Sequence, residues 1–584
     1  MKSVVRYLRK YWAESLLAPL LKCAEATLEL LVPLVMRRII DSAIPAGDFA
    51  QVRRNGLLML GLALLGLVFS VAAQFLAAHS SYRMGTDMRN GLLSHINALS
   101  MTETDNIGTS KLINRLNTDV VRVQDGVNLF LRLFLRSPFI VVGSLIMAML
   151  VEPKLAIVML CALPVLAAAV FLISRFGLDR VTASQNKLDH LALITRSSLS
   201  GARVIRAFGR TDAEEAEFAE AGEGLRKLSL EAGRVTELMN PLTYILLNIA
   251  IALILYRGGK FVGIGSVTTG TVIVIIDYMT ELLTETIRVS ELVASLSKGI
   301  ASARRVETVF EAESSMPDGE VGEVAPAKEA IRFDRVSLRY HEGAEEALSD
   351  ISFTVNAGET CAIIGGTGEG KTSLLSLIPR LYDATSGTVY VDGVDVRDYR
   401  LEALRARMGV APQRAVLLAD TVRETVRMGR AEVTEADIVK ALRTAQAYDF
   451  VTEKPEGLDS PILRMGDNFS GGQKQRLAIA RALAASPEIL LLDDSFSALD
   501  ALTDRSLRRD LKANYPAATV VFVSQKISTV KSADRILVLD DGRLVGEGSH
   551  KELVRSCPVY REICRSQEVP LEASPSEEEV SAHE

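Results

Sequence analysis

The chain has 584 residues, of which 48% are hydrophobic and 24% charged, and its formal net charge is −6. A chain of this length is too long for one hydrophobic core, so two or more domains are expected. The acidic balance gives no sign of nucleic-acid binding, and five scattered cysteines without C-x-x-C spacing favour buried thiols in a reducing compartment over a disulfide framework or a zinc site.

The first half of the chain contains apolar stretches long enough to cross a bilayer, which takes roughly 20 residues each. The clearest is 57–78, which carries no charge, and the pattern before the first stretch does not predict a cleavable signal peptide. We therefore predict an all-α transmembrane domain of six long helices over residues 1–310. The predicted spans lie near 15–40, 56–79, 129–151, 155–176, 238–257 and 270–292.

The first and sixth predicted spans carry charges at helical spacing. Charged side chains at membrane depth must face protein or water. Pairing between helices is the preferred interpretation, and contact of Glu29 or Asp277 with a transported substrate is the alternative. The charged residues are Lys22, Glu25 and Glu29 in the first span and Asp277, Glu281 and Glu285 in the sixth.

The distribution of basic residues predicts the orientation. The basic N-terminus and the long segments 80–127 and 177–237 are predicted to be cytoplasmic, whereas the connections near 41–55, 152–154 and 257–269 are predicted to be external. Six spans return the chain to the cytoplasm. We therefore expect a multi-pass protein of a bacterial cell membrane whose C-terminal domain is cytoplasmic.

The second half of the chain has a different pattern. A polar linker over 311–330 is followed by β-rich runs that alternate with helical ones, which predicts an α/β domain over 331–566. The residues 567–584 are rich in Glu, Ser and Pro and are predicted to be a disordered acidic tail. The candidate strands are 331–333, 352–355, 360–364, 389–391, 489–492, 520–523 and 536–539.

A glycine-rich loop lies between an apolar run and a helix-prone segment, with the spacing G-x-x-x-x-G-K-S/T. Backbone N–H groups of such a loop surround phosphates, the lysine reaches the outer phosphates, and the hydroxyl ligates Mg²⁺. An ordinary glycine-rich turn is the weaker alternative, so the loop predicts binding of a nucleoside triphosphate. The predicted contacts are Gly365, Gly366, Thr367, Gly368, Glu369, Gly370, Lys371, Thr372 and Ser373.

A second chemical signal is the apolar run 489–492, which ends in Asp493 and Asp494. The carboxyl ends of neighbouring parallel strands share a crevice, so this acidic pair can meet the phosphate loop. Asp493 is predicted to hold Mg²⁺ through water, and Asp494 to point towards the γ-phosphate.

A third signal is the segment from Asn468 to Arg476, which contains the letters FSGGQ and opens a helix. Together with the phosphate loop and the acidic pair, it resembles the signature of ATP-binding cassette (ABC) proteins. With six N-terminal spans, the chain resembles an ABC exporter half-transporter over residues 1–566. Ser470, Gly471, Gly472 and Gln473 then form a second anion site at a helix N-terminus.

The resemblance implies a dimer, because in that family two ATPase domains clamp two ATP molecules, each phosphate loop facing the other subunit's signature. It also implies that Tyr340 stacks on adenine and that Gln413 contacts Mg²⁺ and the attacking water. Residues 497–500 match the loop that crosses to the partner's site. Residues 201–208 resemble an intracellular loop that docks on an ATPase domain.

Two positions depart from the family pattern. Asp494 stands where a catalytic glutamate is expected, and Gln525 where a switch histidine is expected. A shorter carboxylate misplaced by about 1 Å can cost on the order of 10²-fold in rate, and glutamine brings no positive charge to the transition state. We therefore predict ATP binding without efficient turnover, in a heterodimer with a non-identical half-transporter that supplies the competent site.

Several functions remain open at this level. The leading one is ATP-driven export of amphipathic small molecules, lipids or peptides, as in multidrug transport. The alternatives are import of a metal–chelator complex by the same fold, and an ABC protein in which ATP gates or regulates a channel without pumping.

Overall fold

The computed structural model describes residues 1–568 except residue 342, and leaves out the side chains of residues 174, 178, 290, 291 and 294. The chain divides into two compact units. The helical unit comprises Met1–Asn97 and Gly108–Ala312, and the α/β unit comprises Ala98–Ile107 and the chain from Glu313. Apart from its first two residues, the predicted acidic tail lies outside the described part of the chain.

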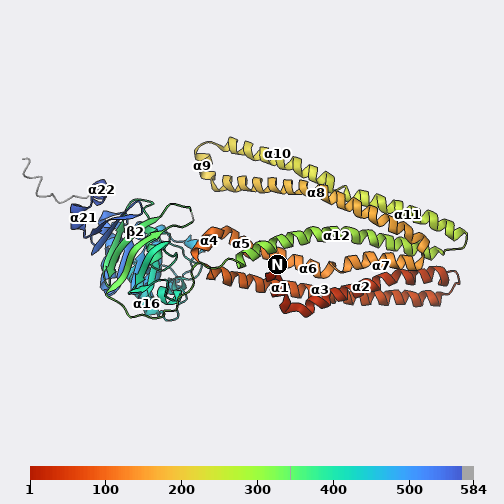
Figure 1. The fold of residues 1–584 in the computed structure, drawn as a ribbon, viewed down its shortest axis with the longest axis horizontal. Coiled ribbons are helices and arrows are strands. Elements are labelled where there is room, and N and C mark those ends of the chain that lie inside the picture. Colours follow the sequence, from red (N-terminus) through yellow and green to blue (C-terminus); the bar gives the residue numbers. More distant parts are fainter. Residues whose placement is uncertain (342, 569–584) are drawn as a thin grey trace, which may run out of the picture. The chain divides into compact units, whose positions relative to one another are not determined.

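The helical unit is built of long helices joined by short turns (Figure 1). In chain order its helices are α1 (Lys2–Leu8), α2 (Trp12–Arg38), α3 (Phe49–Ala98), α5 (Thr109–Asn114), α6 (Val120–Leu133), α7 (Arg136–Val151), α8 (Pro153–Ser200), α9 (Ala202–Ala207), α10 (Thr211–Thr236), α11 (Met239–Gly263) and α12 (Thr269–Phe310). A tight turn joins α7 to α8, where the Glu152 side chain accepts a hydrogen bond from the backbone N–H of Lys154 at 3.3 Å and Pro153 occupies the first turn.

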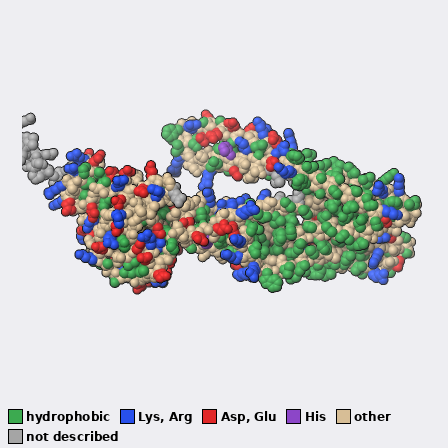
Figure 2. Space-filling model, in the orientation of Figure 1, with side chains coloured by type: hydrophobic (Ala, Val, Ile, Leu, Met, Phe, Trp, Pro, Cys, Tyr) green, Lys and Arg blue, Asp and Glu red, His purple; other side chains and the backbone are tan. Residues whose placement is uncertain are grey.

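Among the residues that the structure describes, four helical segments are long and apolar enough to cross a membrane: Phe49–Ala98, Thr109–Val151, Pro153–Ser200 and Thr211–Gly263. They contain the second to fifth predicted spans. The first and sixth predicted spans lie in α2 and α12, which carry the charges noted above. Hydrophobic side chains cover much of one end of the helical unit, as Figure 2 shows, and this apolar surface suits lipid.

Some of the charges inside the helical unit pair between helices. The Arg136 guanidinium on α7 donates to Glu29 on α2 at 2.8 Å and to Glu285 on α12 at 2.6 Å. Lys22 donates to Glu25 at 2.6 Å and to the Ser70 hydroxyl on α3 at 2.9 Å. The preferred interpretation, interhelix pairing, is therefore confirmed for Glu29 and Glu285. It is wrong for Glu25, whose ion pair with Lys22 lies within α2, and for Asp277 and Glu281, which form no ion pair with the described residues.

The described part of the α/β unit contains two sheets. A six-stranded sheet has the order β10-β9-β3-β8-β7-β6, parallel except for β10, and a four-stranded antiparallel sheet has the order β2-β1-β4-β5. The strands are β1 (Glu329–Leu338), β2 (Leu348–Asn356), β3 (Thr360–Ile364), β4 (Ser386–Val391), β5 (Val394–Asp395), β6 (Met408–Ala411), β7 (Ile489–Leu492), β8 (Thr519–Val523), β9 (Arg535–Asp540) and β10 (Arg543–Gly548).

The central strands of the larger sheet are buried on both faces, which explains their continuous apolar sequence. Alternate residues of β3 enter different hydrophobic clusters: Ala362 and Ile364 join one, and Cys361 and Ile363 the other. The helices of this unit are α13 (Lys371–Leu377), α14 (Leu401–Ala406), α15 (Val422–Arg427), α16 (Glu435–Thr444), α17 (Tyr448–Thr452), α18 (Gly471–Leu483), α19 (Ala501–Asn514), α20 (Ile527–Val530), α21 (His550–Ser556) and α22 (Pro558–Ser566).

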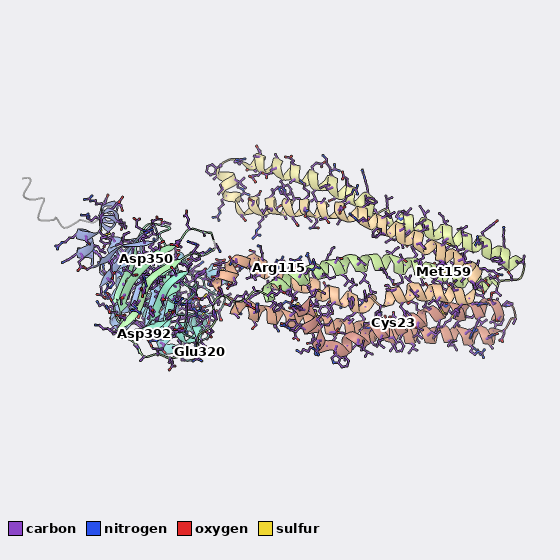
Figure 3. The ribbon with its side chains drawn as sticks, in the orientation of Figure 1. Cys23, Arg115, Met159, Glu320, Asp350 and Asp392 are labelled. Atoms are coloured by element: carbon purple, nitrogen blue, oxygen red, sulfur yellow. The ribbon has the colours of Figure 1, made fainter. Side chains whose placement is uncertain are left out.

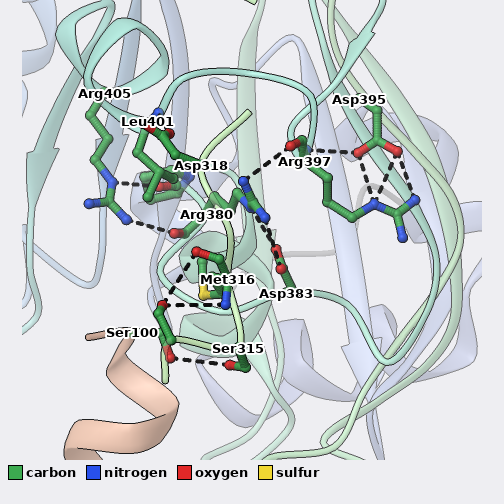
Figure 4. A network of polar contacts seen from close by, with 12 residues as sticks. Ser100, Ser315, Met316, Asp318, Arg380, Asp383, Asp395, Arg397, Leu401 and Arg405 are labelled. Carbon is green, nitrogen blue, oxygen red and sulfur yellow. Dashed lines mark hydrogen bonds and ion pairs between the residues drawn. The ribbon is translucent and has the colours of Figure 1, made fainter. Parts of the chain in front are cut away.

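A short segment from the first third of the chain belongs to the α/β unit. It contains α4 (Met101–Ile107), and the Ser100 hydroxyl lies 3.4 Å from that of Ser315 (Figure 4). The backbone N–H of Ser315 donates to the Glu103 carboxylate at 3.3 Å. The sequence did not predict that residues 98–107 join the α/β unit, because helical periodicity continues on both sides of the segment.

The cysteines are free thiols, as expected. The expectation that all five are buried is wrong, since Cys161 on α8 is exposed and Cys23 on α2 is half-buried. Figure 3 labels Cys23, together with Met159, a fully buried core residue of α8. Cys161 lies in a helix with a lipid-compatible surface, so an exposed thiol there meets no conflict with its apolar surroundings.

Candidate nucleotide-binding site

The phosphate loop connects β3 to α13. Gly368 and Gly370 have φ values of +94° and +85°, which favour glycine. A Cβ atom at Gly370 would lie 2.4 Å from the Ala347 carbonyl oxygen, and one at Gly365 would lie 2.4 Å from that of Leu539. The glycines of the motif therefore allow a tight turn against neighbouring backbone, and this turn leads directly into the N-terminus of α13.

Lys371 is buried at the start of α13. Its amino group donates to the Gly365 carbonyl oxygen at 3.0 Å and also contacts that of Gly366. Burial lowers the pKa of Lys371, although nearby carboxylates act in the opposite direction. The side chain is thus folded back over the loop, where a phosphate group can replace the carbonyl oxygens as its partner.

Two of the three predicted Mg²⁺ ligands, Thr372 and Asp493, lie together. The Thr372 hydroxyl is 3.0 Å from each carboxylate oxygen of Asp493, which follows β7. Both groups offer oxygen, the ligand that Mg²⁺ prefers, and Mg²⁺ usually keeps several waters and substrate phosphates as its other ligands. Burial raises the pKa of Asp493, and the nearby Asp494 adds to this rise. A bound cation would offset that cost, so the residues fit Mg²⁺.

Asp494 occupies an unusual backbone position, with φ of +43°. Its Oδ1 atom is buried and has no hydrogen-bond partner in the described part of the chain. Burial raises the pKa of Asp494, while Ser497, and after it Lys371, Lys526 and Gln413, act to lower it. Gln413 follows β6, the strand beside β7, and is exposed. The structure therefore places Gln413 beside the acidic pair, and its contact with Mg²⁺ and the attacking water stays a prediction.

Gln525 lies in an exposed loop after β8. The side-chain amide of Gln567 holds this loop: it donates to the Gln525 carbonyl oxygen at 2.6 Å and accepts from the Ile527 backbone N–H at 2.8 Å. Sequence reasoning missed this role of Gln567, because the two residues are 42 positions apart and no motif joins them.

Tyr340 lies at the other side of the phosphate loop. Its hydroxyl donates to that of Ser373 at 2.8 Å, which fixes its position relative to α13. Its ring packs edge-on against Tyr382, with 5.0 Å between centroids. The Tyr382 hydroxyl donates to Asp105 on α4 at 2.6 Å. Neither Tyr382, which packs against the predicted adenine contact, nor Asp105, which binds Tyr382, was predicted.

The side chain of Glu369, one of the predicted loop contacts, is already engaged within the chain. The Glu369 carboxylate accepts a hydrogen bond from the Asp541 backbone N–H, so its backbone rather than its side chain is available to phosphate. The remaining residues, Gly366 and Thr367, lie between β3 and α13 as the motif requires.

The signature begins α18. Ser470 is the N-cap: its hydroxyl accepts from the Gln473 backbone N–H at 3.3 Å, and its own N–H donates to the Gln473 side chain at 3.0 Å. Gly471 is exposed, and a Cβ there would meet nothing within 4 Å. A Cβ at Gly472 would lie 3.0 Å from the Ala498 carbonyl oxygen. The helix N-terminus is thus open at Gly471, outside this chain's own packing.

Comparison with known proteins agrees with this geometry. A family model described as the ABC transporter transmembrane region matches residues 15–287, and a second, described as ABC transporter, matches residues 348–497. The uncharacterized ABC transporter ATP-binding protein YfiB of Bacillus subtilis is 34% identical over 568 residues, which cover 97% of this chain and 98% of that protein. This chain belongs to the ABC transporter family.

A second relative and a solved structure are also similar to this chain over nearly its whole length. An ATP-dependent lipid A-core flippase of Albidiferax ferrireducens is 32% identical over 574 residues, 97% of each chain. The solved structure of a bacterial Atm1-family ABC exporter with ATP bound has the same fold, with a TM-score of 0.81, 23% identity, and coverage of 96% of this chain and 99% of that one. This ABC transporter is therefore a multi-pass half-transporter of the exporter fold, with a transmembrane domain fused to an ATPase domain.

Proposed function

We propose that this ABC transporter is one subunit of a heterodimeric exporter, which binds ATP firmly at its own site and cleaves it slowly there. The proposal rests chiefly on one observation. Lys371, Thr372 and Asp493, which would hold phosphate and Mg²⁺, are assembled, whereas the residues at the two water-activating positions are Asp494 and Gln525.

The reduced turnover has a physical cause. A carboxylate one methylene shorter stays further from the attacking water, and loss of a well-placed general base costs about 10²–10⁴-fold. A glutamine side chain donates a hydrogen bond but offers no positive charge to the γ-phosphate. Neither change affects the loop that binds the phosphates. At this site the rate of ATP cleavage is therefore lowered while the affinity for ATP is kept.

The signature supports a role in a second site. The N–H groups at the start of α18 form an anion site, and Gly471 faces open space. This end of the helix is therefore available to the nucleotide of another subunit. In this proposal the intact Ser470–Gln473 segment completes the partner's competent site, and the phosphate loop here pairs with the partner's signature.

The substrate is proposed to be an amphipathic molecule exported from the cytoplasm, with the N-terminus and ATPase domain on the cytoplasmic side. Similarity to the lipid A-core flippases supports transport of amphipathic compounds. Import of a metal–chelator complex and ATP-gated channel function are the competing functions, and the direction of substrate accumulation in vesicles distinguishes them.

The decisive experiment compares ATPase rates. The purified chain is reconstituted alone, and together with a half-transporter that carries glutamate and histidine at the positions of Asp494 and Gln525. We expect on the order of 10²-fold faster turnover in the mixed complex, since it contains one competent site. Equal turnover by this chain alone would contradict the heterodimer.

A further inference from the structure

The helical unit contains a cavity of about 320 Å³ between α2, α7 and α12. Pockets for small ligands usually begin near 300 Å³ and combine apolar walls with a few polar groups. The walls here follow that composition, because Leu30, Val32 and Ile140 supply apolar surface and three carboxylates line the same space. The carboxylates belong to Glu29, Asp277 and Glu281.

The charges beside this cavity can be counted from their contacts. Arg136 pairs with Glu29 and with Glu285, and Arg288 pairs with Glu285 at 2.5 Å. Two guanidinium groups therefore balance two carboxylates. Arg136 and Glu285 are both buried, with side chains 8% and 0% exposed, and Glu29 is the residue through which this network reaches the cavity.

Asp277 and Glu281 stand outside this balance. They lie one helical turn apart on α12, and within the described residues neither makes a hydrogen bond or an ion pair. One turn further along, the buried Oε2 atom of Glu285 also has no hydrogen-bond partner. The cavity thus carries surplus negative charge from Asp277 and Glu281 inside a transmembrane region, where uncompensated charge is costly, and the unmet acceptor of Glu285 lies one turn beyond them on α12.

A positive ligand would relieve that cost. We propose that this cavity binds an amphipathic organic cation, with its positive group beside Asp277 and Glu281 and its apolar part against Leu30, Val32 and Ile140. The ring of Tyr278 stiffens the wall, because this buried residue donates its hydroxyl hydrogen to the Leu30 carbonyl oxygen at 2.7 Å. An anionic lipid headgroup would be repelled by the same carboxylates.

A bare metal ion fits the cavity less well. Ca²⁺ takes six to eight oxygen ligands, and Mg²⁺ demands near-octahedral geometry. The searched part of the chain contains no group of three or more residues suited to a metal ion, and apolar surface forms much of the wall. That the bound cation is also the exported substrate rests on the proposed function above.

The test uses two probe ions of similar shape and opposite charge, tetraphenylphosphonium and tetraphenylborate. Equilibrium binding to the full chain in lipid nanodiscs is measured without ATP, after subtraction of binding to empty nanodiscs. We expect the cation to bind at least about tenfold more tightly than the anion, since only the cation gains attraction to the carboxylates. Equal affinity for the two ions would overturn the proposal.

Variants locate the site. Asp277→Asn with Glu281→Gln should weaken cation binding by about tenfold or more, whereas Thr280→Ala, an uncharged lining position, should leave it unchanged. Undiminished cation binding by the double variant would also overturn the proposal. Should that variant fail to fold, the comparison of the two ions on the unaltered chain still tests whether the cavity prefers a cation.

Failure of the exporter proposal and failure of the cation site give different experimental results. If cation binding depends on both carboxylates but ATP drives no transport in vesicles, the exporter proposal falls and the cation site stands. If ATP drives transport of an uncharged or anionic compound and the cation does not bind, the cation site falls and the exporter proposal stands.

Discussion

Asp494 combines two properties that bear on its chemistry. Its left-handed backbone conformation is tolerated by aspartate better than by most residues, and a buried oxygen atom of its side chain lacks a hydrogen-bond donor. The position can therefore accept aspartate at little conformational cost. A longer carboxylate would reach further from the same backbone, towards the place where water must attack.

This geometry predicts the effect of restoring the family residues. Asp494→Glu combined with Gln525→His should raise ATP turnover of this chain at least about tenfold, because the base is better placed and the switch regains positive charge. Affinity for ATP, measured with a fluorescent analogue, should remain within about twofold. Asp494→Asn is the matched control and should lower turnover. An unchanged rate in the double variant would place the defect elsewhere.

At this scale, contiguous motifs were predictable and distant contacts were not. The phosphate loop is one run of residues whose glycines and lysine have fixed roles, and its placement between β3 and α13 followed from the apolar run before it. Tyr382 and Gln567 act through partners 277 and 42 positions away. No local periodicity or motif in one sequence encodes such a pairing.

At the scale of elements, α18 illustrates a helix whose first turn serves two purposes. The capping box of Ser470 and Gln473 stabilises the helix within this chain, while Gly471 adds nothing to the chain's own packing. A change at Gly471 can therefore affect an external ligand without unfolding the helix. A variant at Gly471 can therefore test whether the signature contacts a ligand without changing the stability of the fold.

Gly471→Asp should leave folding and ATP binding by this chain nearly unchanged, yet abolish most turnover in a complex with a competent partner. The added carboxylate would occupy open space and repel the phosphates of the partner's nucleotide. Turnover and melting temperature are both measured. Gly224→Asp on α10, another glycine in open space, serves as the control. Retained turnover with Gly471→Asp would argue against contact with a second nucleotide.

The Arg136 network predicts a second effect at this scale. Arg136→Met should destabilise the helical unit by about 3–5 kcal/mol, because it leaves buried carboxylate charge without its main partner. Adding Glu29→Gln and Glu285→Gln should recover most of that loss. Thermal unfolding in detergent measures both changes. Arg175→Met, which breaks an exposed pair with Asp179, should change little, and an equal loss there would contradict the argument.

Elements with strong apolar patterns were predictable, and weak ones were missed. All seven predicted strands are present, but β5, β6 and β10 were not predicted. β5 has only two residues, β6 is a short run that includes a glycine, and β10 is an edge strand with two glycines and alternating exposure. Edge position and glycine both reduce the apolar signal on which such predictions depend.

At the scale of the whole molecule, the order of segments along the chain differs from their grouping in space. The chain passes between the two units after Asn97, again after Ile107, and finally after Ala312. The predicted domain limits at 310 and 330 describe only the last of these passages. A single linear boundary was the natural prediction because composition changes abruptly only there.

This threefold passage has a consequence for dissection of the protein. A fragment that begins at Glu313 would lack α4, so Tyr382 would lose Asp105 and Ser315 would lose Glu103. We expect such an excised ATPase fragment to melt at a lower temperature than one to which a peptide of residues 98–107 is added in excess, since ligand binding to the folded state raises its stability. No single protease cut can liberate this catalytic module intact, because its own surface is assembled from two remote stretches of the polypeptide.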